Sequence, residues 1–81
     1  MTGEKSVKHD GEIIRHIRLL KNLNQYGVGY KMGITQQAFA KLEKLVTIPE
    51  KKILDILIAL GSSPKEFEVV KYLLYPPIKP E

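Results

Sequence analysis

The stretch QYGVGYKMGITQQ (residues 25–37) holds the residues whose types and spacing could do chemistry. Three of the chain's six glycines lie here, Gly27, Gly29 and Gly33, and closely spaced glycines can form the phosphate-binding loop of a nucleotide site. A dinucleotide fingerprint, G-x-G-x-x-G after a strand, would need its third glycine where Met32 stands, and the preceding segment has a helical pattern. A P-loop would need Gly-Lys-Ser/Thr, which does not follow. The stretch does not predict a nucleotide site.

The same glycines have a structural interpretation, because two short helices joined by a tight turn use glycine in this way. Gly33 fits the position after a helix, where the left-handed conformation strains any residue with a Cβ. Gly29 gives a surface without a side chain on which a second helix can press. Gly27 has neither role and lowers helix stability by roughly 1 kcal/mol relative to alanine. The nearby apolar residues fit the shared core of two crossing helices: Val28, Met32, Ile34, Phe39 and Leu42.

The periodicity of apolar residues predicts an all-α chain of five short helices. The first covers roughly residues 11–22 with Asp10 as its N-cap. The second and third follow the caps Asn24 and Thr35. The fourth begins at a capping box, Thr47 with Glu50, and ends before Gly61, and the fifth runs from Ser63 to about Tyr75. No alternating strand pattern and no repeat is found.

Length and composition predict one small domain over residues 10–75, with a polar, disordered arm at residues 1–9 and a proline-rich tail at residues 76–81. There is no cysteine, no secretory signal pattern and no apolar run that would span a bilayer, so we expect a cytoplasmic protein without membrane contact. The net charge of +4 suits an anionic partner, although many unrelated small proteins are equally basic.

The residues that could support catalysis are scattered. His9 and His16 lack further ligands, and the carboxylates Asp10, Glu12 and Glu43 have no nucleophile or base beside them. We therefore expect no enzyme activity, no metal site and no cofactor.

The segment from Arg18 to Glu43 resembles the Xre family of helix-turn-helix regulators, the lambdoid-phage repressor and Cro class. The similarity rests on Asn24-Gln25, the glycine turn GITQQ and the final Leu-Glu, at that family's spacing. It extends more weakly over residues 10–67. The resemblance implies a lambda-repressor-like helix-turn-helix domain that binds double-stranded DNA and regulates transcription, as a repressor does.

The resemblance implies a role for individual side chains. Residues 36–43 would form the recognition helix in the major groove, with Gln36 and Gln37 pairing with adenine, Lys41 reaching a guanine or a phosphate, and Ala38 meeting a thymine methyl. Without the resemblance, these glutamines and Lys41 are better interpreted as solvated surface residues than as base contacts.

Phosphate contacts are implied for Asn24 and Gln25, at the start of the preceding helix. The sequence departs from the family after Glu43, where KLVTIPEKK replaces a polar, basic loop. Phosphate binding is therefore expected to move to Lys44 and to Lys51 with its neighbour Lys52. In this family the first-helix arginine commonly pairs with the glutamate that ends the recognition helix, which implies an ion pair between Arg18 and Glu43.

Two questions stay open at the level of sequence. The apolar loop LVTI and the apolar last helix also suit a protein-interaction module of the same fold, such as an antitoxin subunit. The last helix has a second apolar stripe, Val69 and Leu73, which predicts a homodimer. The alternative is that Leu54 and Ile58 cover this stripe within one chain.

Overall fold

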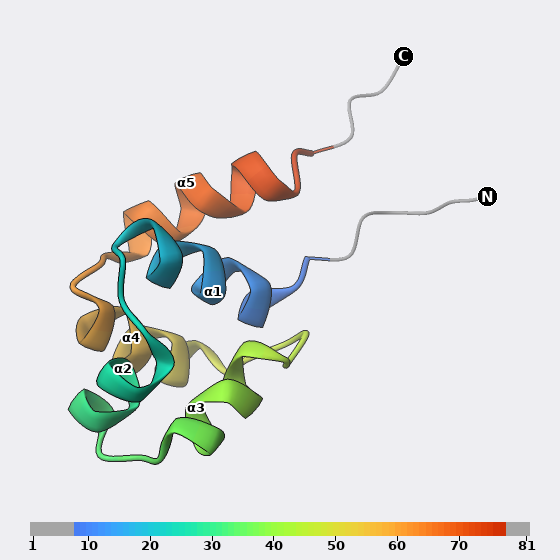
Figure 1. Cartoon of the computed structure of the whole chain (residues 1–81). Coiled ribbons are helices and arrows are strands. Elements are labelled where there is room, and N and C mark those ends of the chain that lie inside the picture. Colours follow the sequence, from blue (N-terminus) through green and yellow to red (C-terminus); the bar gives the residue numbers. More distant parts are fainter. Residues whose placement is uncertain (1–7, 78–81) are drawn as a thin grey trace.

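The computed structural model describes residues 8–77 of the chain. These residues contain five α-helices and no strands (Figure 1). The helices are α1 (Asp10–Leu20), α2 (Gln25–Met32), α3 (Gln36–Glu43), α4 (Glu50–Leu60) and α5 (Pro64–Leu74). The expected all-α class with five short helices is confirmed. Of the expected arm and tail, residues 1–7 and 78–81 lie outside the described residues.

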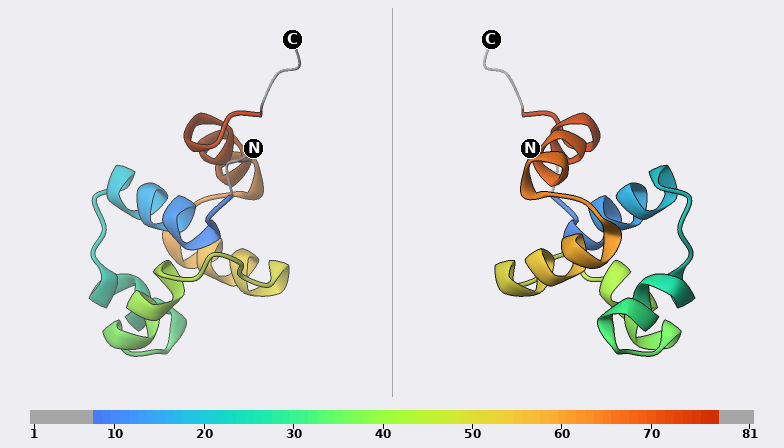
Figure 2. Two further views of the ribbon diagram at one scale, coloured as in Figure 1. Left: turned by 90° about the vertical axis from the view of Figure 1, so that its right-hand side faces the viewer. Right: turned by 90° about the vertical axis from the view of Figure 1, so that its left-hand side faces the viewer.

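The helices are arranged around α1 and α4. α2 and α3 lie at one end of the molecule and α5 at the other, with α1 and α4 between them (Figures 1 and 2). α1 contacts α3, α4 and α5, whereas α3 contacts only α1 and α2 among the described helices. α3 is therefore a peripheral helix, with part of its surface free of other elements.

The core forms mainly around α1, because three of its isoleucines, at i, i+1 and i+4, are fully buried. Burying one such side chain stabilises the fold by roughly 1.5–3 kcal/mol. The largest fully buried side chains come from four of the five helices: Ile13, Ile14, Ile17, Val28, Phe39, Ile56 and Leu57.

The turn between α2 and α3 depends on two glycines, as the sequence predicts. Gly33 has φ +76°, in the left-handed region, and its N–H bonds to the carbonyl of Tyr30 at 3.0 Å. At Gly29, a Cβ would lie 3.1 Å from the carbonyl oxygens of both Ile34 and Thr35. Glycine at this position therefore lets the chain entering α3 pass directly over α2.

Two of the predicted caps are wrong. The N-cap of α1 is His9, whose Nδ1 accepts from the N–H of Glu12 at 3.0 Å, and Asp10 is the first helical residue. The expected capping box at Thr47 does not form, because Pro49 is the N-cap of α4 and makes no side-chain cap bond. The carboxylate of Asp10 is instead used in a tertiary bond, since it accepts from the N–H of Ile48 at 2.9 Å. Pro49 disfavours the helical conformation at Ile48, the residue before it, so α4 does not begin at Thr47.

The loop between α3 and α4 is held by the N-terminus of α1. The N–H of Asp10 bonds to the carbonyl of Val46 at 2.8 Å, and the N–H of Gly11 to that of Leu45 at 2.9 Å. The first N–H groups of a helix have no partner within it, so these bonds satisfy two of them. A Cβ at Gly11 would lie 2.3 Å from the carbonyl oxygen of Glu43, so no other residue fits.

α5 lies antiparallel to α1. At one end, Lys21 pairs with Glu66 at 3.3 Å, and the hydroxyl of Ser62 donates to the same carboxylate. The hydrogen bond from Ser62 and the Lys21 ammonium lower the pKa of Glu66. At the other end, burial of Tyr75 and the charge of Glu12 raise the pKa of the Tyr75 phenol.

The second apolar face of α5 is not covered within the chain. Val69 and Leu73 are 50% and 71% exposed. Leu54 and Ile58, offered above as the cover, are themselves 41% and 77% exposed, so that alternative is wrong. Both remain exposed because α4 buries mainly the other side of its helix, with Ile56, Leu57 and Leu60.

Gly11→Ala should lower the free energy of unfolding by about 3 kcal/mol, the upper end of the usual cost of overpacking, because the new methyl group meets backbone that cannot rotate away. The matched control is Gly27→Ala. Its Cβ would meet only the Asn24 side chain, at 3.2 Å, and stability should change by less than about 1 kcal/mol. Urea unfolding measures both. Equal stability of the two variants would contradict the close approach at Gly11.

Candidate nucleic-acid interface

The first two turns of α3 present polar side chains to solvent. Gln36, Gln37 and Lys41 are exposed, and Ala38 is half-buried. Thr35 caps the helix by accepting from the N–H of Ala38 at 3.0 Å. α3 therefore begins at Gln36, and the two glutamines occupy its first turn, as expected.

Behind this surface lies a buried ion pair. Arg18 Nε donates to Glu43 Oε2 at 2.6 Å, and Arg18 Nη2 donates to Glu43 Oε1 at 3.2 Å. The residues are only 7% and 5% exposed. This is the pair that the resemblance implies, and its two parallel bonds fix the direction of both side chains. The C-terminal end of α3 is thereby attached to α1.

The same carboxylate also positions α2. Gln25 Nε2 donates to Glu43 Oε1 at 2.9 Å, and Gln25 Oε1 lies 3.5 Å from Gln36 Nε2, at the long limit of a hydrogen bond. The half-buried Gln25 thus bridges the buried carboxylate and the exposed first turn of α3. One of its two amide protons is already used, which leaves one for a phosphate.

The remaining predicted phosphate contacts lie on three elements. Asn24 is exposed, and its Oδ1 caps α2 by accepting from Gly27 N–H at 2.7 Å, a bond that does not use the donors of its amide nitrogen. Lys44 is exposed at the residue after α3. Lys51 is also exposed but lies in the first turn of α4. The structure brings Gln25 and Gln36 together, whereas Lys51 belongs to a helix that does not contact α3.

The surface of residues 24–44 is positive. It carries Lys31, Lys41 and Lys44, all exposed, and its one carboxylate, Glu43, is buried against Arg18. The first turns of α2 and α3 contain no acidic residue, whereas those of α1, α4 and α5 do. Residues 24–44 thus present lysines, amides and helix N-termini to an anion, and no exposed carboxylate of their own.

Within residues 8–77, no three histidine or carboxylate side chains are grouped closely enough to hold a metal ion. The described helices are also all too short or too polar to cross a lipid bilayer.

Sequence reasoning missed the second role of Gln25 and the whole contribution of Asp10 and Gly11. Gln25 was expected only as a phosphate ligand. A signal for Gly11 existed, because a glycine inside the first turn of a helix lowers stability unless another backbone comes close. Nothing in the sequence identifies that backbone as the end of α3.

Glu43→Ala should lower the free energy of unfolding by roughly 3–5 kcal/mol, because it leaves the buried Arg18 without a counter-charge. The double variant Arg18→Met/Glu43→Leu should cost much less. Glu12→Ala is the control, since Glu12 forms only partly exposed pairs, with Arg15 at 3.4 Å and with His16 at 3.8 Å, and should cost less than about 1 kcal/mol. Thermal and urea unfolding measure all three. A Glu43→Ala protein as stable as Glu12→Ala would show that the pair contributes nothing.

No protein-family model, no curated protein and no solved structure matches this chain.

Proposed function

We propose that the protein binds double-stranded DNA in a sequence-specific manner through α3, and that it regulates transcription. The observation that carries the proposal is the exposed first turn of α3, where Gln36 and Gln37 stand on a peripheral helix with Lys41 one turn further. A glutamine amide can pair with N6 and N7 of adenine, and lysine can reach guanine or phosphate. The geometry suits the major groove, which is wide enough for one helix.

In this proposal α2, the turn at Gly33 and α3 act as a helix-turn-helix. α3 is the recognition helix, with Ala38 as a small apolar contact for a thymine methyl. Asn24 and Gln25 hold a phosphate at the N-terminus of α2, and Lys44 and Lys51 contact further phosphates of the backbone. The resemblance of residues 18–43 to the Xre family supports this assignment, and so does the lack of exposed carboxylates on α2 and α3.

A second candidate function is binding to a protein, as an antitoxin subunit does. It is favoured by Leu45 and Val46, which are about half exposed on the loop after α3. Ile48, which sequence reasoning placed on the same apolar surface, is instead buried in the core at 3% exposure. The loop therefore offers two adjacent apolar side chains rather than three.

Selection from a random pool of double-stranded DNA, at a stated salt concentration, tests the proposal. Sequence-specific binding should enrich a short motif. Binding that is equal for all sequences and falls steeply with salt would instead reflect only the positive surface, and would favour the protein-binding function.

On an enriched site, Gln36→Ala or Gln37→Ala should weaken binding by roughly 1–3 kcal/mol, with little effect on random DNA, because each would remove a contact to a base edge. Lys65→Ala, an exposed change in α5 far from α3, is the control and should leave the preference unchanged. Titration of both DNAs at one salt concentration measures the difference. Equal losses on the two DNAs would exclude base reading by these glutamines.

We also propose that the protein forms a homodimer through the exposed face of α5. Leu73→Glu should convert the dimer to a monomer at micromolar concentration, because it places a charge in an apolar contact. Ile58→Glu is a matched control, since this side chain is as exposed as Leu73 but lies on α4. Sedimentation measures the mass of each. A wild-type monomer, or a dimer lost only in Ile58→Glu, contradicts the assignment to α5.

A further inference from the structure

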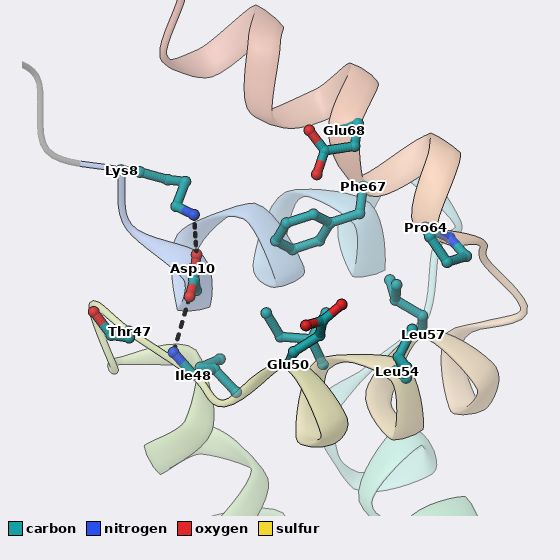
Figure 3. Close-up of a pocket in the computed structure, with 11 residues that line it drawn as sticks. Lys8, Asp10, Thr47, Ile48, Glu50, Leu54, Leu57, Pro64, Phe67 and Glu68 are labelled. Atoms are coloured by element: carbon teal, nitrogen blue, oxygen red, sulfur yellow. Dashed lines mark hydrogen bonds and ion pairs between the residues drawn. The ribbon is translucent and has the colours of Figure 1, made fainter.

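A cavity of about 350 Å³ lies on the side of the molecule formed by the start of α1, the loop before α4, and helices α4 and α5. Its apolar lining includes Ile53, Leu57 and Phe67, and the Phe67 side chain extends into it from α5 (Figure 3). The volume is at the small end of the range for ligand pockets in proteins, roughly 300–1,000 Å³. The cavity therefore has room for one small organic molecule.

One end of this cavity carries a buried carboxylate with an unused acceptor. Asp10 Oδ2 accepts from the N–H of Ile48, but Oδ1 is buried and accepts no hydrogen bond from any described residue. Lys8 Nζ is 3.4 Å from Oδ1, too far for a good N–H···O bond (Figure 3). The Lys8 side chain is 45% exposed, whereas that of Asp10 is 5% exposed. Lys8 is thus a partly exposed counter-ion that covers Oδ1 without a good hydrogen bond to it.

The charges around the cavity favour a cation. Its lining contains three carboxylates and one ammonium group: Asp10, Glu50, Glu68 and Lys8. Glu68 is mostly exposed and pairs with Lys71 at 2.9 Å, so its charge is compensated. Glu50 forms no ion pair with any residue of the described part of the chain. When Lys8 moves out, the cavity holds two uncompensated carboxylates beside an apolar surface.

We infer that this cavity binds a small amphipathic cation, an amine with an aromatic or alkyl body. Its ammonium group takes the place of Lys8 Nζ and donates to Asp10 Oδ1, where a bond to a buried charged acceptor is strong. Its apolar body lies against Leu57 and Phe67, and Glu50 adds a second negative charge. The site does not depend on the proposed DNA-binding function, since it shares no residue with the exposed turn of α3.

The test is a titration of the full chain with 2-phenylethylamine, followed by backbone amide NMR, with 2-phenylethanol as the uncharged control. At pH 7 the amine is protonated, as alkylamines such as lysine are. We expect saturable shifts at the amides of Asp10, Gly11 and Ile48, and much weaker binding of the alcohol. The absence of saturable shifts, or equal affinity for amine and alcohol, overturns the inference.

Three variants distinguish binding at this site from non-specific binding to the protein surface. Lys8→Ala should bind the amine more tightly, because it removes the competing ammonium group. Asp10→Asn should bind about tenfold more weakly or worse, the factor expected for one hydrogen bond to a charged group. Glu50→Gln should also weaken binding, and it keeps the test decisive if Asp10→Asn does not fold. Asp55→Asn, an acidic residue of α4 outside the cavity, is the control. Unchanged or weaker binding by Lys8→Ala, or equal affinity of Glu50→Gln and Asp55→Asn, overturns the inference.

Discussion

The buried pair of Arg18 and Glu43 is the interaction on which the positions of α2 and α3 depend. Removing two charges from water is costly, and a pair of apolar residues could fill the same space without that cost. An apolar pair, however, does not fix the relative orientation of its two side chains. The guanidinium and the carboxylate meet through two parallel hydrogen bonds, so each accepts its partner in one orientation only. Such a pair selects one arrangement of helices among those that apolar packing alone would allow.

The guanidinium makes a third hydrogen bond, which extends this constraint. Arg18 Nη1 donates to the carbonyl of Leu23 at 2.9 Å, in the connection that leads into α2. α1 and α2 make no direct helix-to-helix contact in the described structure. The connection is also sharply turned, since Asn22 has φ +59°, which is unusual for a residue other than glycine. A single arginine of α1 is therefore hydrogen-bonded both to the connection before α2 and to the end of α3.

The features that could be predicted from the sequence are those with local causes. Apolar spacing, caps such as Asn24 and Thr35, and the left-handed Gly33 each act within a few residues, and the five helices follow from them. The pairing of Arg18 with Glu43 came from the family resemblance rather than from spacing.

The features that could not be predicted join distant parts of the chain. The bond between Asp10 and Ile48 spans 38 residues, and it uses the carboxylate that the local signal assigns to the cap of α1. The exposure of Ile58 was missed for a similar reason, because the side that α4 buries depends on the helices around it. DNA binding by α3 likewise depends on its exposed side chains and on a partner molecule, and the local rules for helices and caps do not determine it.

The loop after α3 is anchored by its main chain and not by its side chains. The carbonyls of Leu45 and Val46 accept from α1, while the side chains of residues 44–47 are exposed. Every amino acid has such a carbonyl, so substitutions here can change the chemistry of this surface without moving the loop. The position of this loop therefore does not depend on which side chains it carries. Evolution or an engineer can change those side chains to suit a new partner.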